Sequence, residues 1–203
     1  MKAKIVQNPI EYWKKIEYTP GTYSITIPYE TTCNVILVGG GGGGHYNASA
    51  WSSMSRVGGS AAMISGTFTI PAGTYTVIVG VAGGVGGATI FYNQSAGGGG
   101  KAYANVWDPG SSYDGAGGLA TVTSGSQIPT LTYSNGVKGS TISRYLTYGG
   151  GAGGAGYGNE NPLGQTGFAV IEYLSDSSDY TYTKQTSDVK LYKTGTTYKA
   201  FNI

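Results

Sequence analysis

Alternation of apolar and polar positions predicts short β-strands along most of the chain. In residues 74–79, Thr and Tyr alternate with Val and Ile, which is the two-residue period of a half-buried strand. Residues 62–70 read similarly, and the Pro-Ala-Gly sequence at 71–73 predicts a hairpin of the two segments. No segment shows the 3.6-residue period of an amphipathic helix. Further strands are expected at 23–27, 35–38, 119–123, 131–133 and 168–174.

Glycine runs follow several of these strands, and they have a period of their own. Residues 39–44 are six consecutive glycines, and residues 97–100 are four more. A non-glycine residue recurs at every third position in the other runs, which are 57–60, 82–88, 116–119 and 152–155. Three residues per turn is the period of the extended polyproline II helix, called polyglycine II when glycine forms it.

Bundling of such helices would explain the glycines. Each helix leaves its N–H and C=O groups pointing outward, and neighbouring helices can satisfy them only where no Cβ holds the backbones apart. We therefore expect 39–44 and 97–100 in the interior of a bundle and the Ala- and Val-bearing runs at its edges. The alternative is a set of flexible glycine-rich linkers, which would need neither the period nor the flanking strands. The predicted fold is an all-β antiparallel sandwich with an inserted polyglycine II bundle.

Composition excludes several classes of protein. Glycine fills 37 of 203 positions and charged residues only 11%, against a usual ~25%. The 12 Lys and Arg residues are scattered, so no nucleic-acid partner is expected. No apolar stretch approaches the ~18 residues of a membrane span, so no membrane insertion is expected. Cys33 is the single cysteine; it precedes an apolar strand and is expected to be a buried thiol.

Three segments differ in character. Residues 1–17 form an N-terminal segment with an expected role in attachment, and they lack the apolar stretch of a secretory signal. Residues 18–175 contain the strands and glycine runs. Residues 176–203 are rich in Tyr and Lys, and a Thr-Gly-Thr turn at 194–196 predicts a C-terminal hairpin. This hairpin is either an edge element of the main domain or a docking element for another chain.

No motif for catalysis, a cofactor or a metal is present in the sequence. The only Lys after a glycine run, Lys101, is followed by Ala102, so the phosphate-binding P-loop pattern is absent. The single histidine is His45, and the sequence contains no G-x-S-x-G nucleophile elbow that could form a catalytic triad with it. Asp108 with Asp114 is a formal carboxylate pair, and Asp176 with Asp179 is a loose calcium-type loop that we interpret as solvated. We expect no enzyme activity, no cofactor and no metal site.

The order of strand, Pro-Ala-Gly turn, strand and glycine run at 62–88, foreshadowed at 35–44, resembles the glycine-rich domains at the tips of bacteriophage tail fibres. A related arrangement occurs in the glycine-rich domain of anaplastic lymphoma kinase. The resemblance covers about residues 18–175. It implies binding to a bacterial cell-surface receptor, a glycan or an outer-surface protein, through loops at the distal ends of the polyglycine helices. It also implies a fibre or tail subunit as a partner and a location on the virion.

Aromatic residues with amides, hydroxyls and a few charges gather between the glycine runs. Aromatic faces stack on sugars, and the same mixture suits protein recognition surfaces. We expect the loops 45–56, 89–95 and 157–163 at the end far from the sandwich, with the polarity of loop 103–114 left open. The candidate ligand-binding residues are His45, Tyr46, Asn47, Trp51, Tyr92, Asn93, Gln94, Trp107, Asp108, Tyr113, Tyr157 and Asn159.

Two other functions remain open at this point. The aromatic loops can instead cap the bundle of a structural or assembly module of a fibre, which would have no ligand site of its own. Ice binding requires a flat, regular face, and the bulky irregular loops argue against it.

Overall fold

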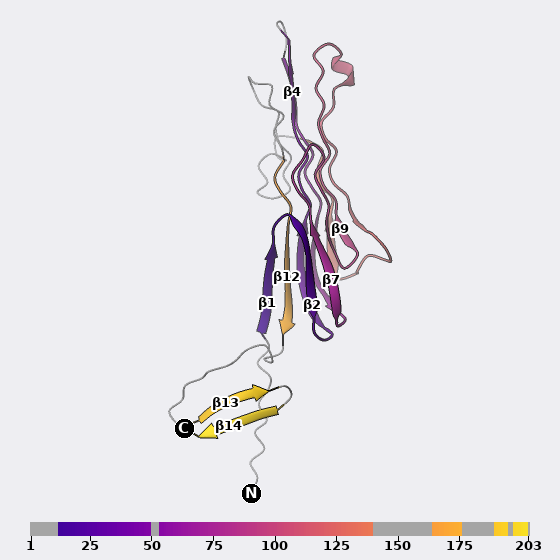
Figure 1. Cartoon of the computed structure of the whole chain (residues 1–203). Coiled ribbons are helices and arrows are strands. Elements are labelled where there is room, and N and C mark those ends of the chain that lie inside the picture. The colour runs from indigo at the N-terminus through magenta and orange to yellow at the C-terminus, as the bar shows by residue number, and fades with distance from the viewer. Residues whose placement is uncertain (1–11, 50–52, 140–163, 176–188, 195–196, 203) are drawn as a thin grey trace. The chain divides into compact units, whose positions relative to one another are not determined.

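The computed structural model describes residues 12–49, 53–139, 164–175, 189–194 and 197–202 (Figure 1). The chain divides into two compact units, residues 15–172 and residues 1–14 together with 173–203. The sandwich, the glycine runs and most of the predicted site lie in the first unit.

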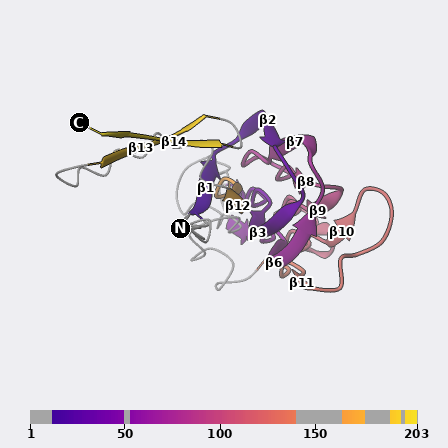
Figure 2. The ribbon, with the colours of Figure 1, turned by 90° about the horizontal axis from the view of Figure 1, so that it is seen from below.

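Two five-stranded sheets face each other in this fold (Figure 2). The first sheet has the order β1 (Tyr12–Tyr18), β12 (Phe168–Ser175), β3 (Thr31–Val38), β6 (Met63–Ile70) and β11 (Leu131–Ser134). The second has the order β10 (Ala120–Val122), β9 (Gln94–Ala96), β8 (Thr89–Phe91), β7 (Gly73–Val79) and β2 (Gly21–Ile27). The all-β sandwich that the alternation predicts is confirmed, and the only α- or 3₁₀-helical segment of the described residues is the three-residue η1 (Pro109–Ser111).

Alternate side chains of the strands make the core between the sheets. In β3, Cys33, Val35 and Leu37 are buried, while the residues between them are half-exposed. The inward face of β7 contributes Val77 and Val79 from the other sheet. Burial of one such side chain contributes about 1.5–3 kcal/mol, so the two-residue period that predicts the strands also builds the core.

The hairpin predicted from the Pro-Ala-Gly turn is wrong. β6 pairs with β3 and β11 in the first sheet, whereas β7 pairs with β2 and β8 in the second. The turn at 71–73 therefore carries the chain from one sheet to the other. This arch places the apolar faces of β6 and β7 on opposite sides of the same core, where a hairpin would have placed them side by side in one sheet.

Two further pairs of strands lie outside the sandwich sheets. β4 (His45–Ala48) pairs with β5 (Ser53–Arg56), and β13 (Val189–Thr194) pairs with β14 (Thr197–Asn202). The second pair is the hairpin predicted around the Thr-Gly-Thr turn. Residues 12–17 of the expected N-terminal segment belong to β1, which is a strand of the first sheet.

The run at 39–44 bonds to its neighbours with a three-residue period. Donors three residues apart reach the same neighbouring run, and their acceptors are also three residues apart. The N–H···O bonds are Gly39 to Ala62 (3.2 Å), Gly42 to Gly59 (3.0 Å), Gly40 to Gly87 (2.8 Å), Gly43 to Gly84 (2.9 Å) and Gly41 to Gln165 (2.8 Å). This rotation of the donors by one third of a turn per residue is the geometry of a polyglycine II helix.

The same period recurs in the other runs. Pairs of donors three residues apart again share one neighbouring run. Run 97–102 donates to 115–119 (Gly97 to Leu119, Gly100 to Ala116) and to 39–44 (Gly99 to Gly40, Ala102 to Gly43). Run 115–119 donates to 57–62 (Gly115 to Val57, Gly118 to Ser60), and run 136–139 donates to 115–119 (Gly136 to Gly118, Gly139 to Gly115). We call the described segments 39–44, 57–62, 80–88, 97–102, 115–119, 136–139 and 164–167 the bundle.

The backbones of the bundle are too close together for a side chain. A Cβ built on Gly42 would lie 2.0 Å from the carbonyl oxygen of Gly100, and one on Gly86 would lie 1.8 Å from that of Gly40. Real Cβ atoms essentially never come within 3.0 Å of another heavy atom. Glycine is therefore required here by the close approach of backbones, which excludes the flexible-linker interpretation for the described runs.

The side chains at every third position follow the predicted edge pattern in only some runs. Val85 is 68% exposed and Leu119 is 61% exposed, so their runs present these residues outward. Val57 and Ser60 are buried instead. Their run donates to or accepts from 39–44, 97–102, 115–119 and 136–139, so it lies in the interior of the bundle.

Candidate functional site

The bundle connects the sandwich to two loops at its far end (Figure 1). β3 leads through 39–44 into β4, and β5 returns through 57–62 to β6. Likewise β9 leads through 97–102 into residues 103–114, which return through 115–119 to β10. We call β4, β5 and residues 103–114 the tip.

Residue Ala104 is the point where the two parts of the tip are joined. Its backbone N–H donates to Nδ1 of His45 (2.8 Å), and its carbonyl accepts from Nδ2 of Asn47 (3.2 Å). His45 and Asn47 are two residues apart on β4, so they reach the 103–114 loop from the same face of the strand. In this contact Nδ1 is the acceptor of the hydrogen bond.

Three aromatic rings lie in a row beside this junction. The ring of His45 stacks on that of Tyr103, with centroids 5.4 Å apart and planes 20° apart. The Tyr103 ring lies 5.8 Å from that of Tyr113. Tyr103 and Tyr113 also exchange two backbone hydrogen bonds of 2.9 and 2.8 Å. Tyr113 is 55% exposed, so the row presents one end to solvent.

The turn between the two tyrosines is held by its own polar side chains. The Asn105 side-chain oxygen accepts from the backbone N–H of Trp107 (3.0 Å) and of Asp108 (3.3 Å). The Ser112 hydroxyl accepts from the backbone N–H of Asn105 (2.9 Å). Asp114 accepts from the backbone N–H of Val57 (3.0 Å), which fixes the loop to the bundle. On this ordered turn the Trp107 side chain is 80% exposed.

Charged groups are few at the tip. Arg56 on β5 is paired in register with His45, and Lys101 and Asp108 are exposed. Among the described residues no group of three or more His, Cys, Asp or Glu side chains is placed to hold a metal ion. The arrangement offers aromatic faces, amides and a carboxylate, which are groups for binding a ligand through stacking and hydrogen bonds.

The tip contains many of the predicted site residues. His45, Tyr46, Asn47, Trp107, Asp108 and Tyr113 all belong to it, and this settles the polarity of the 103–114 loop. Trp51, Tyr157 and Asn159 lie outside the described residues. Tyr103 and Asn105 are missing from the prediction. The run at 97–102 leaves the end of a strand, and that order along the chain is the signal that would have placed the following loop at the tip.

The expected placement of the loop at 89–95 is wrong. Tyr92 and Asn93, with φ of 47° and 61°, form the two-residue turn between β8 and β9 within the second sheet. The Tyr92 ring stacks on Phe68 (5.3 Å) and meets Tyr75 edge-on (5.4 Å). The Gln94 side chain is buried and donates to the Tyr92 carbonyl (3.2 Å). These three residues belong to the sandwich.

The reason for this error lies in the preceding glycine run. Residues 80–88 contain two short polyglycine II segments. The second segment lies against the first, because Gly87 donates back to Val81 (2.9 Å), and it lies along 39–44, because Gly43 donates to Gly84 (2.9 Å). The chain therefore turns near Gly84 and Val85 and is already back in the sheet at Thr89.

These features define a class of protein, an all-β scaffold in which a sandwich and a polyglycine II bundle carry an aromatic tip. The family model of the glycine-rich domain matches residues 18–199, and the chain belongs to this family. A comparison with curated protein sequences gives no match. No helix among the described residues has the length and hydropathy needed to cross a membrane.

Proposed function

We propose that this protein is a receptor-binding adhesin of a bacteriophage tail fibre or tail tip. In this proposal the tip recognises a glycan or an outer-surface protein of the bacterial host, and the protein acts on the virion, joined to a fibre or tail subunit. The observation that carries the proposal is the exposed Trp107 side chain on a turn fixed by Asn105, beside the His45–Tyr103–Tyr113 row.

The chemistry of the tip supports a binding role over catalysis. Aromatic rings held in place offer rigid contact area at low entropic cost, and neighbouring amides and hydroxyls offer adaptable hydrogen bonds. Trp and Tyr are also the residue types that most often dominate a binding free energy. Fixing the turn through Asn105 and Ser112 lowers the cost of ordering it when a ligand binds.

A structural module of a fibre is the second candidate, since stacked rings can simply close the end of the bundle. The row of His45, Tyr103 and Tyr113 suits that role. Trp107 does not, because a side chain that is 80% exposed covers little of the bundle. Trp107 therefore distinguishes the two candidates.

Binding of the labelled full chain to intact cells of a panel of bacteria tests the proposal, with extracted surface polysaccharide as competitor. We expect Trp107→Ala to lose most of the binding, because an anchor aromatic that becomes buried against the partner costs about 2 kcal/mol or more when truncated. Leu119→Ala is the matched control, an exposed apolar residue of the bundle outside the tip. If wild type and both variants fail to bind any cells, or if all three bind equally well, the result would favour the structural module.

A further inference from the structure

Among the described strands, β1, β2, β10 and β11 lie at the edges of the two sheets, and β2 differs from the rest. β10 has three residues and β11 has four, while β1 carries Lys14, Lys15 and Glu17 in its sequence. β2 has seven residues with neither charge nor proline, and all seven pair with β7 in unbroken register. Proteins usually protect long edges with charges, prolines or bulges, because unpaired N–H and C=O groups recruit another strand. β2 has none of these protections.

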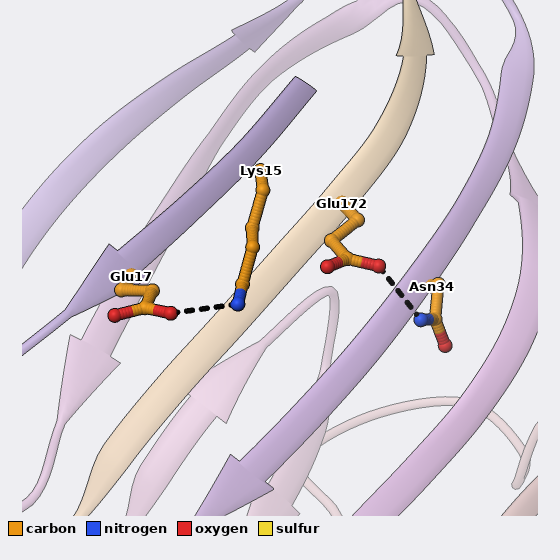
Figure 3. Close-up of polar contacts among 4 residues, drawn as sticks. All are labelled: Lys15, Glu17, Asn34 and Glu172. Carbon is orange, nitrogen blue, oxygen red and sulfur yellow. Dashed lines mark hydrogen bonds and ion pairs between the residues drawn. The ribbon is translucent and has the colours of Figure 1, made fainter. Parts of the chain in front are cut away.

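Charge is divided unequally between the sheets. The five strands of the second sheet contain no Asp, Glu, Lys or Arg. In the first sheet, Lys15 forms an ion pair with Glu17 (2.8 Å), and Glu172 accepts from Asn34 (3.0 Å) (Figure 3). The hydrogen bond and charge of Glu17 raise the pKa of Lys15, so Lys15 stays charged at neutral pH. The first sheet thus has a charged outer face.

The outer face beside the β2 edge is instead a set of hydroxyl side chains. Thr22, Ser24 and Thr26 of β2 are exposed, and their register partners on β7 are Ile78, Thr76 and Thr74, also exposed. The hydroxyl oxygens of Thr26 and Thr74 are 3.2 Å apart. No charge on this face would be desolvated or repelled if a second strand lay against β2.

We propose that β2 pairs with β2 of a second copy of this chain, antiparallel and about a two-fold axis. This would join the two second sheets into one continuous ten-stranded sheet. About a two-fold axis residue i of one strand lies opposite residue j of the other, and only the central residue lies opposite its own counterpart, so a charge at the centre would face a like charge. The absence of charge from β2 removes that penalty. Full overlap of residues 21–27 centres the axis on Ser24, the middle residue of the strand.

This inference is independent of the proposed function, because β2 belongs to the sandwich and the binding residues belong to the tip. A strand pair buries less area than the about 1,000 Å² expected of a stable interface. We therefore expect association that depends on protein concentration. The dimer would present two tips, one from each copy, which strengthens attachment to a surface bearing repeated receptors.

Sedimentation velocity of the full chain over a range of concentrations tests the inference. We expect wild type to pass from monomer to dimer, and Ser24→Lys and Ser24→Glu each to dimerise several-fold more weakly, since like charges then meet at the axis. An equimolar mixture of the two variants should recover the dimer, because Lys then faces Glu. Circular dichroism spectra and melting curves check that both variants remain folded.

Thr76→Lys is the matched control, because Thr76 is the β7 partner of Ser24 on the same exposed face, one strand away from the edge. It should dimerise as wild type does. A wild type that stays monomeric at every concentration would overturn the inference, as would a mixture of Ser24→Lys and Ser24→Glu that fails to recover the dimer.

Discussion

His45 holds the tip through one ring nitrogen. Nδ1 accepts the N–H of Ala104 at 2.8 Å, while Asn47 binds the carbonyl of the same residue. Two side chains of β4 thus satisfy both backbone polar groups of Ala104, which joins the 103–114 loop to β4.

We expect His45→Ala to release the 103–114 loop, because the N–H of Ala104 then loses its acceptor. The measurement is hydrogen exchange of the Ala104 amide by NMR in the variant and in wild type. His45→Asn is the control, because its side-chain oxygen is again an acceptor. Equal exchange of the Ala104 amide in His45→Ala and in wild type would contradict this role.

Cys33 is the residue whose chemistry burial changes most. It is fully buried in β3, and desolvation raises the pKa of its thiol from 9.0 to about 12. Because the folded pKa lies above the unfolded one, the contribution of Cys33 to stability is fully present below pH 9 and is lost as pH rises toward 12.

We expect the native protein to resist a thiol-specific reagent at neutral pH and to react with it once urea unfolds the chain. The loss of stability above pH 9 should be smaller in Cys33→Ala than in wild type, with the free energy of unfolding measured by urea titration at several pH values. Rapid labelling of the native thiol would show that the strand opens readily.

At the scale of elements, the sequence predicts strands better than it predicts their partners. Alternation in β6 and β7 marks the inward faces correctly, because burial acts on each residue separately. The Pro-Ala-Gly turn is compatible with a hairpin and with an arch, and the choice depends on β2, β3, β8 and β11, which lie elsewhere along the chain. Pairing is a long-range property that local pattern does not contain.

The glycine runs are the opposite case. Their period is predictable because exclusion of Cβ is a local requirement that each run must meet. Which run lies in the interior is not predictable, as the buried Val57 and Ser60 show, because the number of neighbours depends on the whole bundle. The position of a loop depends in the same way on the whole bundle. A loop that follows a glycine run lies at the tip only where that run continues away from the sandwich.

Tyr92 is a structural residue of the sandwich in this account. Loss of its stack on Phe68 and its edge contact with Tyr75 should lower the free energy of unfolding of Tyr92→Ala by about 1–2 kcal/mol. Trp107→Ala, which removes an exposed ring, should change it by less than about 0.5 kcal/mol. Urea titration of both variants measures the two values. The reverse order of the two effects would place the structural ring at the tip and contradict the assignment of Tyr92.

At the scale of the whole molecule, the sandwich and the bundle of residues 15–172 share their hydrogen bonds. Thr89, at the start of β8, is fully buried; its hydroxyl donates to the Val38 carbonyl (2.7 Å) and accepts from the Gly80 N–H (3.0 Å). Val38 ends β3 and Gly80 follows β7. One side chain thus connects both sheets to the first turns of two glycine runs. Damage inside the bundle should therefore reduce the stability of the sandwich as well.

The central claim is that contact between backbones, and not flexibility, is the reason for the glycines. One substitution at two positions tests it: a Cβ on Gly42 would lie 2.0 Å from a carbonyl oxygen, whereas the nearest atom to one on Gly84 is Cδ of Lys101 at 3.5 Å. Gly42→Ala should lower the free energy of unfolding by about 3 kcal/mol or prevent folding. Gly84→Ala should leave it unchanged or raise it by about 0.4–1 kcal/mol. The measurement is urea titration of both variants beside wild type, and small, equal changes at the two positions would contradict the bundle.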